Sequence, residues 1–244
     1  LPIVGEEVIE EIRELADRLR GARVLHVNAT AMGGGVAEIL YSLVPLMRDI
    51  GLDAEWQVIH GEAEFYNVTK VLHNTLQGAD IPITPEMKAI YRRYSETNAK
   101  MFEGSYDYAV IHDPQPAALL YYHGRGDIAH WIWRCHIDTS APNQEAWGFL
   151  RPYMEMYDAA IFTLPQYVCG DLHLPHIAIL APTIDPLSPK NQPLTLPEAQ
   201  RLLRKFGVDP DRPLFTQVSR FDPWKDPLGV IDAYRMVKVE VPQL

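Results

Sequence analysis

The apolar residues near the start of the chain recur every three or four positions. Between Val8 and Leu19 they alternate with Glu and Arg on the opposite face of a helical projection, and Gly21 follows. This spacing predicts an amphipathic helix that covers a sheet. Residues 22–30 (ARVLHVNAT) are short and rich in β-branched and apolar residues, which predicts a buried strand directly after that helix.

The next segments predict a βαβ unit. A glycine-rich loop (AMGGG) leads into residues 36–51, which have helical periodicity, are interrupted by Pro45 and end at Gly51. Residues 54–61 (AEWQVIHG) again resemble a strand. A strand, a loop, a helix and a strand within about thirty residues form a βαβ unit, and such units build parallel sheets.

The alternation of helices and strands continues to residue 182. We expect helices at 64–76, 85–102, 117–122 and 140–157, and strands at 106–113, 128–138, 157–165 and 176–182. This order predicts an α/β fold with a doubly wound, mostly parallel sheet of Rossmann-like type over residues 1–182.

Composition changes after residue 182. Residues 183–196 contain a proline every few positions, which predicts a connecting segment. Residues 197–244 then predict a short helix, a strand at 213–218 (PLFTQV) and the start of another helix. One strand and one helix cannot bury a core of their own. Either this piece packs on the first domain or it opens an incomplete second Rossmann-like domain, and we favour the second interpretation.

Overall composition is that of a soluble globular protein, with 47% hydrophobic and 22% charged residues. The net charge of -10 argues against a nucleic-acid partner, although it leaves room for an anionic small ligand at a locally basic site. Cys135 and Cys169 lie among apolar neighbours, so we expect two reduced, buried thiols. No apolar run is long enough to span a membrane and no signal peptide is evident, so we expect a cytoplasmic protein with no membrane partner. Homo-oligomerisation stays open.

Gly33, Gly34 and Gly35 join a predicted strand to a predicted helix. A helix N-terminus leaves N–H groups unpaired, and glycines let an anion approach them. The loop matches neither GxGxxG nor the phosphate loop GxxxxGK[ST]. A tight turn that binds nothing is therefore an equal alternative.

Polar side chains follow four successive predicted strands, at the edge where open α/β sheets bind ligands. They are Asn28, His60, Glu62, His112, Asp113, His136 and Asp138. This arrangement favours a binding site over isolated structural residues. The histidines lack HxH or HExxH spacing, so we expect no metal.

Arg220 and Lys225 lie together in the segment SRFDPWKDP, directly after the strand predicted at 213–218. An arginine can bind two phosphate oxygens at once and a lysine acts as a point charge, so the pair suits a diphosphate. The alternative is a solvated surface turn.

Together these features resemble the retaining glycosyltransferases of the GT-B fold, which have two Rossmann-like domains. The strings VNATAMGGGVAEIL, FYNVTKVLHNTLQG, HDPQP, WRCHID and SRFDPWKDP are most similar to the trehalose-synthesising members. The resemblance implies reversible transfer of glucose from a nucleotide diphosphate glucose to glucose, without a cofactor or metal. It also implies that residues 1–182 form the acceptor-side domain and residues 197–244 begin the donor-binding domain.

The resemblance also implies roles for individual residues. His136, Arg220 and Lys225 would be catalytic: His136 would contact the donor glucose, and the two cations would hold the leaving diphosphate together with the Gly34 and Gly35 backbone. The acceptor-side set would be Asn28, Glu62, Lys70, Asn74, Asp113 and Gln115.

One family feature is missing from the sequence. The acidic motif that holds the donor ribose and sugar would follow Leu244, so we expect little or no transferase activity from these residues alone. The alternatives are a retaining trehalose phosphorylase and a non-catalytic sugar-binding module. A nicotinamide-dependent dehydrogenase is disfavoured because GxGxxG is absent.

Overall fold

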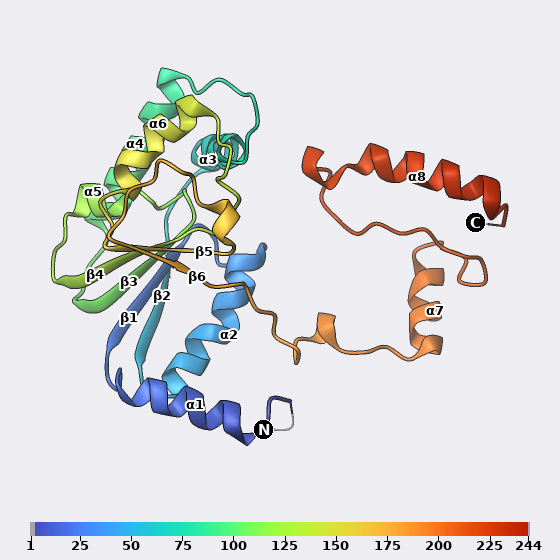
Figure 1. Cartoon of the computed structure of the whole chain (residues 1–244), viewed down its shortest axis with the longest axis horizontal. Helices are drawn as coiled ribbons and strands as arrows, with labels where there is room; N and C mark the ends of the chain where they lie inside the picture. Colours follow the sequence, from blue (N-terminus) through green and yellow to red (C-terminus); the bar gives the residue numbers. More distant parts are fainter. Residues whose placement is uncertain (1–2, 244) are drawn as a thin grey trace. The chain divides into compact units, whose positions relative to one another are not determined.

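The computed structural model describes residues 3–243 and contains a single six-stranded sheet in that range. The strands are β1 (Arg23–Asn28), β2 (Asp53–Val58), β3 (Tyr106–His112), β4 (Ile128–Arg134), β5 (Ala159–Phe162) and β6 (His176–Ile179). Their spatial order is β2-β1-β3-β4-β5-β6, and every neighbouring pair is parallel. The predicted Rossmann-like α/β fold is confirmed (Figure 1).

Helices cover both faces of the sheet. One face carries α1 (Glu6–Asp17) and α2 (Gly35–Asp49), and the other carries α3 (Ala63–Leu76), α4 (Pro85–Lys100), α5 (Leu119–His123) and α6 (Gln144–Met154) (Figure 1). We expected Pro45 to interrupt the second helix, and this was wrong, because α2 runs through it. A proline removes one backbone hydrogen bond, and packing of Leu40 and Val44 against Ala54 of β2 holds the helix together.

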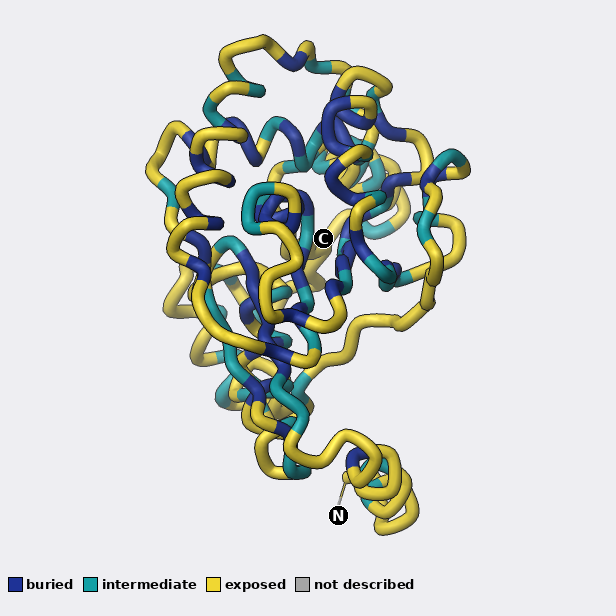
Figure 2. The backbone as a smooth tube through the Cα atoms, turned by 90° about the vertical axis from the view of Figure 1, so that its left-hand side faces the viewer, coloured by how far each residue is buried: buried dark blue, intermediate teal, exposed yellow. Residues whose placement is uncertain are grey.

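Side chains of β1 alternate between two apolar layers. Leu25 and Val27 join the large core beneath α3, α4, α5 and α6, whereas Val24 packs with Ala16 of α1 on the opposite face. His26 and Asn28 share the face of Val24 because strand side chains alternate. Figure 2 shows the buried backbone concentrated along the strands and the inner sides of the helices.

The chain divides into two compact units, Leu1–Asp185 and Pro186–Leu244. The second contains α7 (Leu196–Lys205), α8 (Pro227–Glu240) and two 3-10 turns, Pro189–Asn191 and Pro223–Lys225; the first unit has a third, Pro165–Tyr167. The strand predicted at 213–218 is absent, because a strand requires a partner and this unit has none among its described residues. Between residues 3 and 243, no helix is long and apolar enough to cross a membrane.

Candidate functional site

The parallel strands bring three candidate positions to one edge of the sheet. Asn28 ends β1, while Asp113 and His136 follow β3 and β4. Asn28 is buried; its Oδ1 accepts a hydrogen bond from Trp56 Nε1 at 2.9 Å, and its Nδ2 donates to the Thr30 carbonyl at 2.8 Å. Both ends of the amide are therefore occupied by the protein, and Asn28 anchors the start of the glycine loop.

Asp113 has a backbone conformation that side chains rarely adopt, with φ of 64°. Its Oδ1 accepts a hydrogen bond from the His136 amide at 2.9 Å, and its carbonyl accepts one from Trp133 Nε1 at 3.1 Å. Burial raises the pKa of Asp113 to about 6, and the hydrogen bond from His136 and the charge of Arg134 partly oppose that rise. Asp113 therefore joins the ends of β3 and β4 and fixes the backbone of His136.

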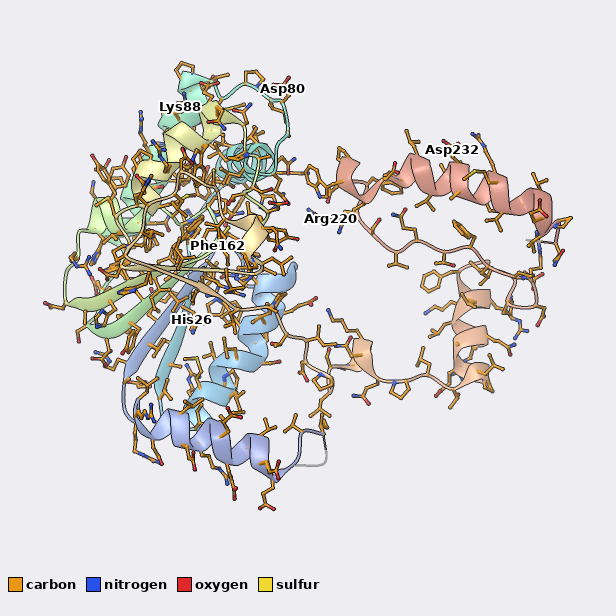
Figure 3. All side chains as sticks on the ribbon, viewed as in Figure 1. His26, Asp80, Lys88, Phe162, Arg220 and Asp232 are labelled. Atoms are coloured by element: carbon orange, nitrogen blue, oxygen red, sulfur yellow. The ribbon has the colours of Figure 1, made fainter. Side chains whose placement is uncertain are left out.

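A chain of imidazole rings leads from the sheet interior to His136. His26 Nδ1 lies 3.0 Å from His112 Nε2, and His112 Nδ1 lies 2.9 Å from His136 Nε2. Burial lowers the pKa of His26 and of His136 to about 4, and that of His112 well below its ordinary value. All three rings are therefore neutral near neutral pH. His26, labelled within the sheet in Figure 3, was not among the sequence candidates.

Gln115 lies in the HDPQP turn after β3. Tyr91 Oη donates to the Pro114 carbonyl and Tyr157 Oη to the Ala117 carbonyl, both at 2.8 Å, so the turn is held from two sides. Gln115 Oε1 is buried, and among residues 3–243 it has no hydrogen-bond partner. A buried acceptor without a donor is rare in folded proteins, which makes Gln115 a candidate ligand contact.

The glycine loop has the backbone that its sequence requires. Gly33 and Gly34 have φ of 76° and 88°, values at which a side chain would be strained. Gly34 is the N-cap of α2 and Gly35 its first residue, and a Cβ built at either would meet no atom within 4 Å. The space beside the Gly34 and Gly35 backbone is therefore open, which favours the approach of an anion to the N-terminal amides of α2.

Three acceptor-side candidates lie on α3 or at its start. Glu62 is the N-cap residue, without a side-chain capping bond, while Lys70 and Asn74 follow at eight and twelve positions. Four-residue steps keep these residues on one helix face. Tyr66 lies on the same face and its hydroxyl donates to the Ala29 carbonyl at 3.1 Å, which ties this face to the loop after Asn28.

Arg220 and Lys225 lie on one loop of the second unit. Arg220 forms an ion pair with Asp222 at 2.7 Å, and its side chain is 71% exposed. Lys225 is the last residue of a 3-10 turn, and the Lys225 carbonyl accepts a hydrogen bond from Gln217 Nε2 at 2.7 Å. The segment is thus ordered locally by its own hydrogen bonds. No group of three or more His, Cys, Asp or Glu suited to a metal ion occurs within residues 3–243.

A family model and the more similar relatives of the chain carry the same name. A family model described as "Trehalose synthase, N-terminal domain" matches residues 26–169. Proteins named trehalose synthase from Rubrobacter xylanophilus and Pyrococcus horikoshii are 53% and 51% identical to the chain over 98% of its length. The chain spans 58% of the length of each of these relatives. A trehalose phosphorylase from Pleurotus pulmonarius is 26% identical over 95% of the chain and 36% of its own length.

Proposed function

Because the chain belongs to the trehalose synthase N-terminal domain family, we propose that it is part of a retaining glycosyltransferase that forms α,α-trehalose. The donor is a nucleotide diphosphate glucose, the acceptor is glucose, and the reaction is reversible. The observation that carries this proposal is the identity of 53% with a trehalose synthase along almost the whole chain, which includes both the strand-edge residues and SRFDPWKDP.

In the proposed reaction, the acceptor hydroxyl attacks the anomeric carbon on the face from which the diphosphate leaves. The C1–O bond to the diphosphate breaks, the new glycosidic bond forms, and the departing phosphate oxygen takes the hydroxyl proton. No carboxylate base is needed, so the protein supplies positioning and positive charge. Burial and the neutral state of His136 support a contact with the uncharged sugar rather than with the diphosphate.

The remaining candidates divide by their chemistry. Arg220 and Lys225 would neutralise the leaving diphosphate, and the amides at Gly34 and Gly35 would approach the diphosphate or the reacting sugar. The acceptor glucose would lie near the candidates on α3 and the turn after β3, which are Glu62, Lys70, Asn74, Asp113 and Gln115. Asn28 would act through the loop that it anchors. No metal or cofactor takes part in this scheme.

The second unit shows no buried residue among residues 186–243. A donor pocket needs a formed wall that excludes water, so we expect the 244-residue chain alone to show little or no turnover. Trehalose formation by the chain alone from nucleotide diphosphate glucose and glucose would contradict this expectation.

The test of the function uses a protein of the relatives' full length that contains this sequence. Arg220→Ala should lower kcat about a hundredfold, or about 3 kcal/mol of barrier, because Arg220 is proposed to act on charge that develops in the transition state. Arg235→Ala is the matched control: Arg235 is 74% exposed and pairs with Asp232 much as Arg220 pairs with Asp222. An effect of Arg220→Ala on KM alone, or equal losses in both variants, would refute the role.

The second candidate function is a retaining trehalose phosphorylase, favoured by the 26% identity to the Pleurotus protein of that name. Supplying the full-length protein with trehalose and either phosphate or a nucleoside diphosphate separates the two, since only a phosphorylase uses free phosphate. A non-catalytic sugar-binding module would instead bind glucose or trehalose in calorimetry without turnover of either.

A further inference from the structure

Met47 lies at the inner end of the histidine chain. Its Sδ is 3.4 Å from His26 Nε2, and Met47 belongs to the last turn of α2, the helix that follows the glycine loop. From this sulfur the contacts run through His26 Nδ1 and His112 Nε2 to His112 Nδ1 and His136 Nε2. One continuous row of polar atoms therefore joins α2, β1, β3 and the loop after β4.

The sulfur sets the direction of the first contact. A thioether has no hydrogen to donate and can only accept. His26 is buried, so solvent does not supply a hydrogen-bond donor to its Nε2 in place of the contact with Met47. A favourable contact with Met47 Sδ therefore requires the proton of His26 to be on Nε2, which leaves Nδ1 as an acceptor.

Each neutral imidazole carries one N–H, so the position of the proton on His26 determines its position on the next two rings. His26 Nδ1 must receive a proton from His112 Nε2. His112 Nδ1 is then an acceptor and must receive one from His136 Nε2. The proton of His136 is thereby assigned to Nε2, and its Nδ1 is left with a lone pair. Within residues 3–243 that Nδ1 has no hydrogen-bond partner.

We propose that Met47, His26 and His112 are positioning residues that fix His136 in one tautomer and present its Nδ1 as a hydrogen-bond acceptor to the ligand. This inference rests on the proposed function only for the identity of the ligand. A lone pair at Nδ1 attracts a hydroxyl group and repels the oxygens of a phosphate. The tautomer therefore supplies a physical reason for the contact with the donor sugar that the family resemblance implies for His136, and the diphosphate has to be bound elsewhere.

Nitrogen NMR of the imidazole rings tests the assignment, because protonated and unprotonated ring nitrogens resonate far apart. The labelled chain is measured at neutral pH, and the His136→Gln variant identifies the His136 signals. Nε2 of His136 should carry the proton and Nδ1 should not. A proton on Nδ1, or an equal mixture of tautomers, overturns the proposal.

Met47→Leu tests the origin of the preference, since it removes the acceptor and nearly preserves volume. Both His136 signals should shift towards the average of the two tautomers. Met156→Leu is the matched control, because Met156 is 41% exposed and is not a member of the row, and it should leave the signals unmoved. An unchanged tautomer in Met47→Leu overturns the role of Met47.

Inorganic phosphate tests the ligand class. It should leave the His136 signals unmoved, whereas protonation of both ring nitrogens in its presence overturns the assignment to a hydroxyl. None of these measurements requires turnover. A full-length protein that made no trehalose would refute the proposed function but not the tautomer assignment. A mixture of tautomers in an active protein would refute the tautomer assignment but not the function.

Discussion

Both units of the chain form the helices that their local sequence predicts, but among the described residues only the first unit forms a buried core. In Leu1–Asp185 the alternating pattern yields a parallel sheet whose core includes fully buried Trp131, Trp133 and Trp147. In the described part of Pro186–Leu244 helices form as well, and α7 even has a complete capping box between Thr195 and Glu198, yet no residue is buried. Local signals therefore suffice for helices and caps, while burial depends on strands that are distant in sequence.

Hydrogen exchange offers the largest contrast between the units. Amides of β1, β3 and β4 should exchange only through global unfolding, which for a stability of about 5 kcal/mol slows exchange on the order of a thousandfold or more. Amides of α7 and α8 should exchange at close to the rate of an unstructured chain, because short helices without packing are marginal in water. Mass spectrometry of exchanged peptides measures both. Strong protection in α8 would refute the contrast.

A matched pair of tryptophans makes the same comparison by mutation. Trp133 is fully buried and donates to the Asp113 carbonyl, whereas Trp224 is 41% exposed. Trp133→Ala should reduce the free energy of unfolding by about 4 kcal/mol, and Trp224→Ala by less than about 0.5 kcal/mol. Denaturant titration of each variant is the measurement. Equal losses would mean that the second unit contributes to the same cooperative core.

The sequence predicted the first unit better than the second for a physical reason. Short runs of apolar and β-branched residues and glycine turns are local signals, so strands such as ARVLHVNAT and the carboxyl-edge position of His136 could be predicted directly. The segment PLFTQV carries the same local signal but forms no strand, because the signal does not contain the partner that a strand needs.

The histidine chain was missed for a related reason. His26 lies inside an apolar strand and resembles a satisfied core residue. It reaches His112 only because β1 pairs with β3, with His26 opposite Val110, and this register is not local. One sequence signal was available: His26 and Asn28 are two positions apart, which places them on the same face of the strand.

The binding of sugar by the predicted site residues stays a prediction.

Acid should destabilise the first unit selectively. The folded pKa of His26 is lowered from 6.5 to about 4, so the unfolded chain binds the proton first, and stability that is complete above about pH 6.5 is lost as pH falls towards 4. For His26 alone the loss approaches about 3 kcal/mol. Asp113 acts in the opposite direction, because its raised pKa favours protonation in the folded state below about pH 6.

The lowered pKa values of His26, His112 and His136 reduce stability as the pH falls, and only Asp113 acts in the opposite direction in this group. We therefore expect a net loss of stability between about pH 6.5 and pH 4. Thermal unfolding at a series of pH values should therefore show a falling Tm for the first unit. His26→Leu should flatten that dependence, and His130→Leu, at an exposed position of β4, serves as the control for the loss of an imidazole outside the core. A wild-type Tm that is constant over this range would contradict the burial of neutral rings.

Two helix caps provide the smallest and most controlled contrast. Asn143 Oδ1 accepts hydrogen bonds from the amides of Glu145 and Ala146 at the start of α6, and Asp226 Oδ1 accepts one from Gly229 at the start of α8. Asn143→Ala should lower the free energy of unfolding by about 1 kcal/mol, because α6 packs into the core. Asp226→Ala should leave the cooperative transition unchanged and reduce only the helical circular dichroism signal. Loss of a capping hydrogen bond then has different consequences because only α6 packs into a core. A lower Tm in Asp226→Ala would show that α8 is coupled to a core as well.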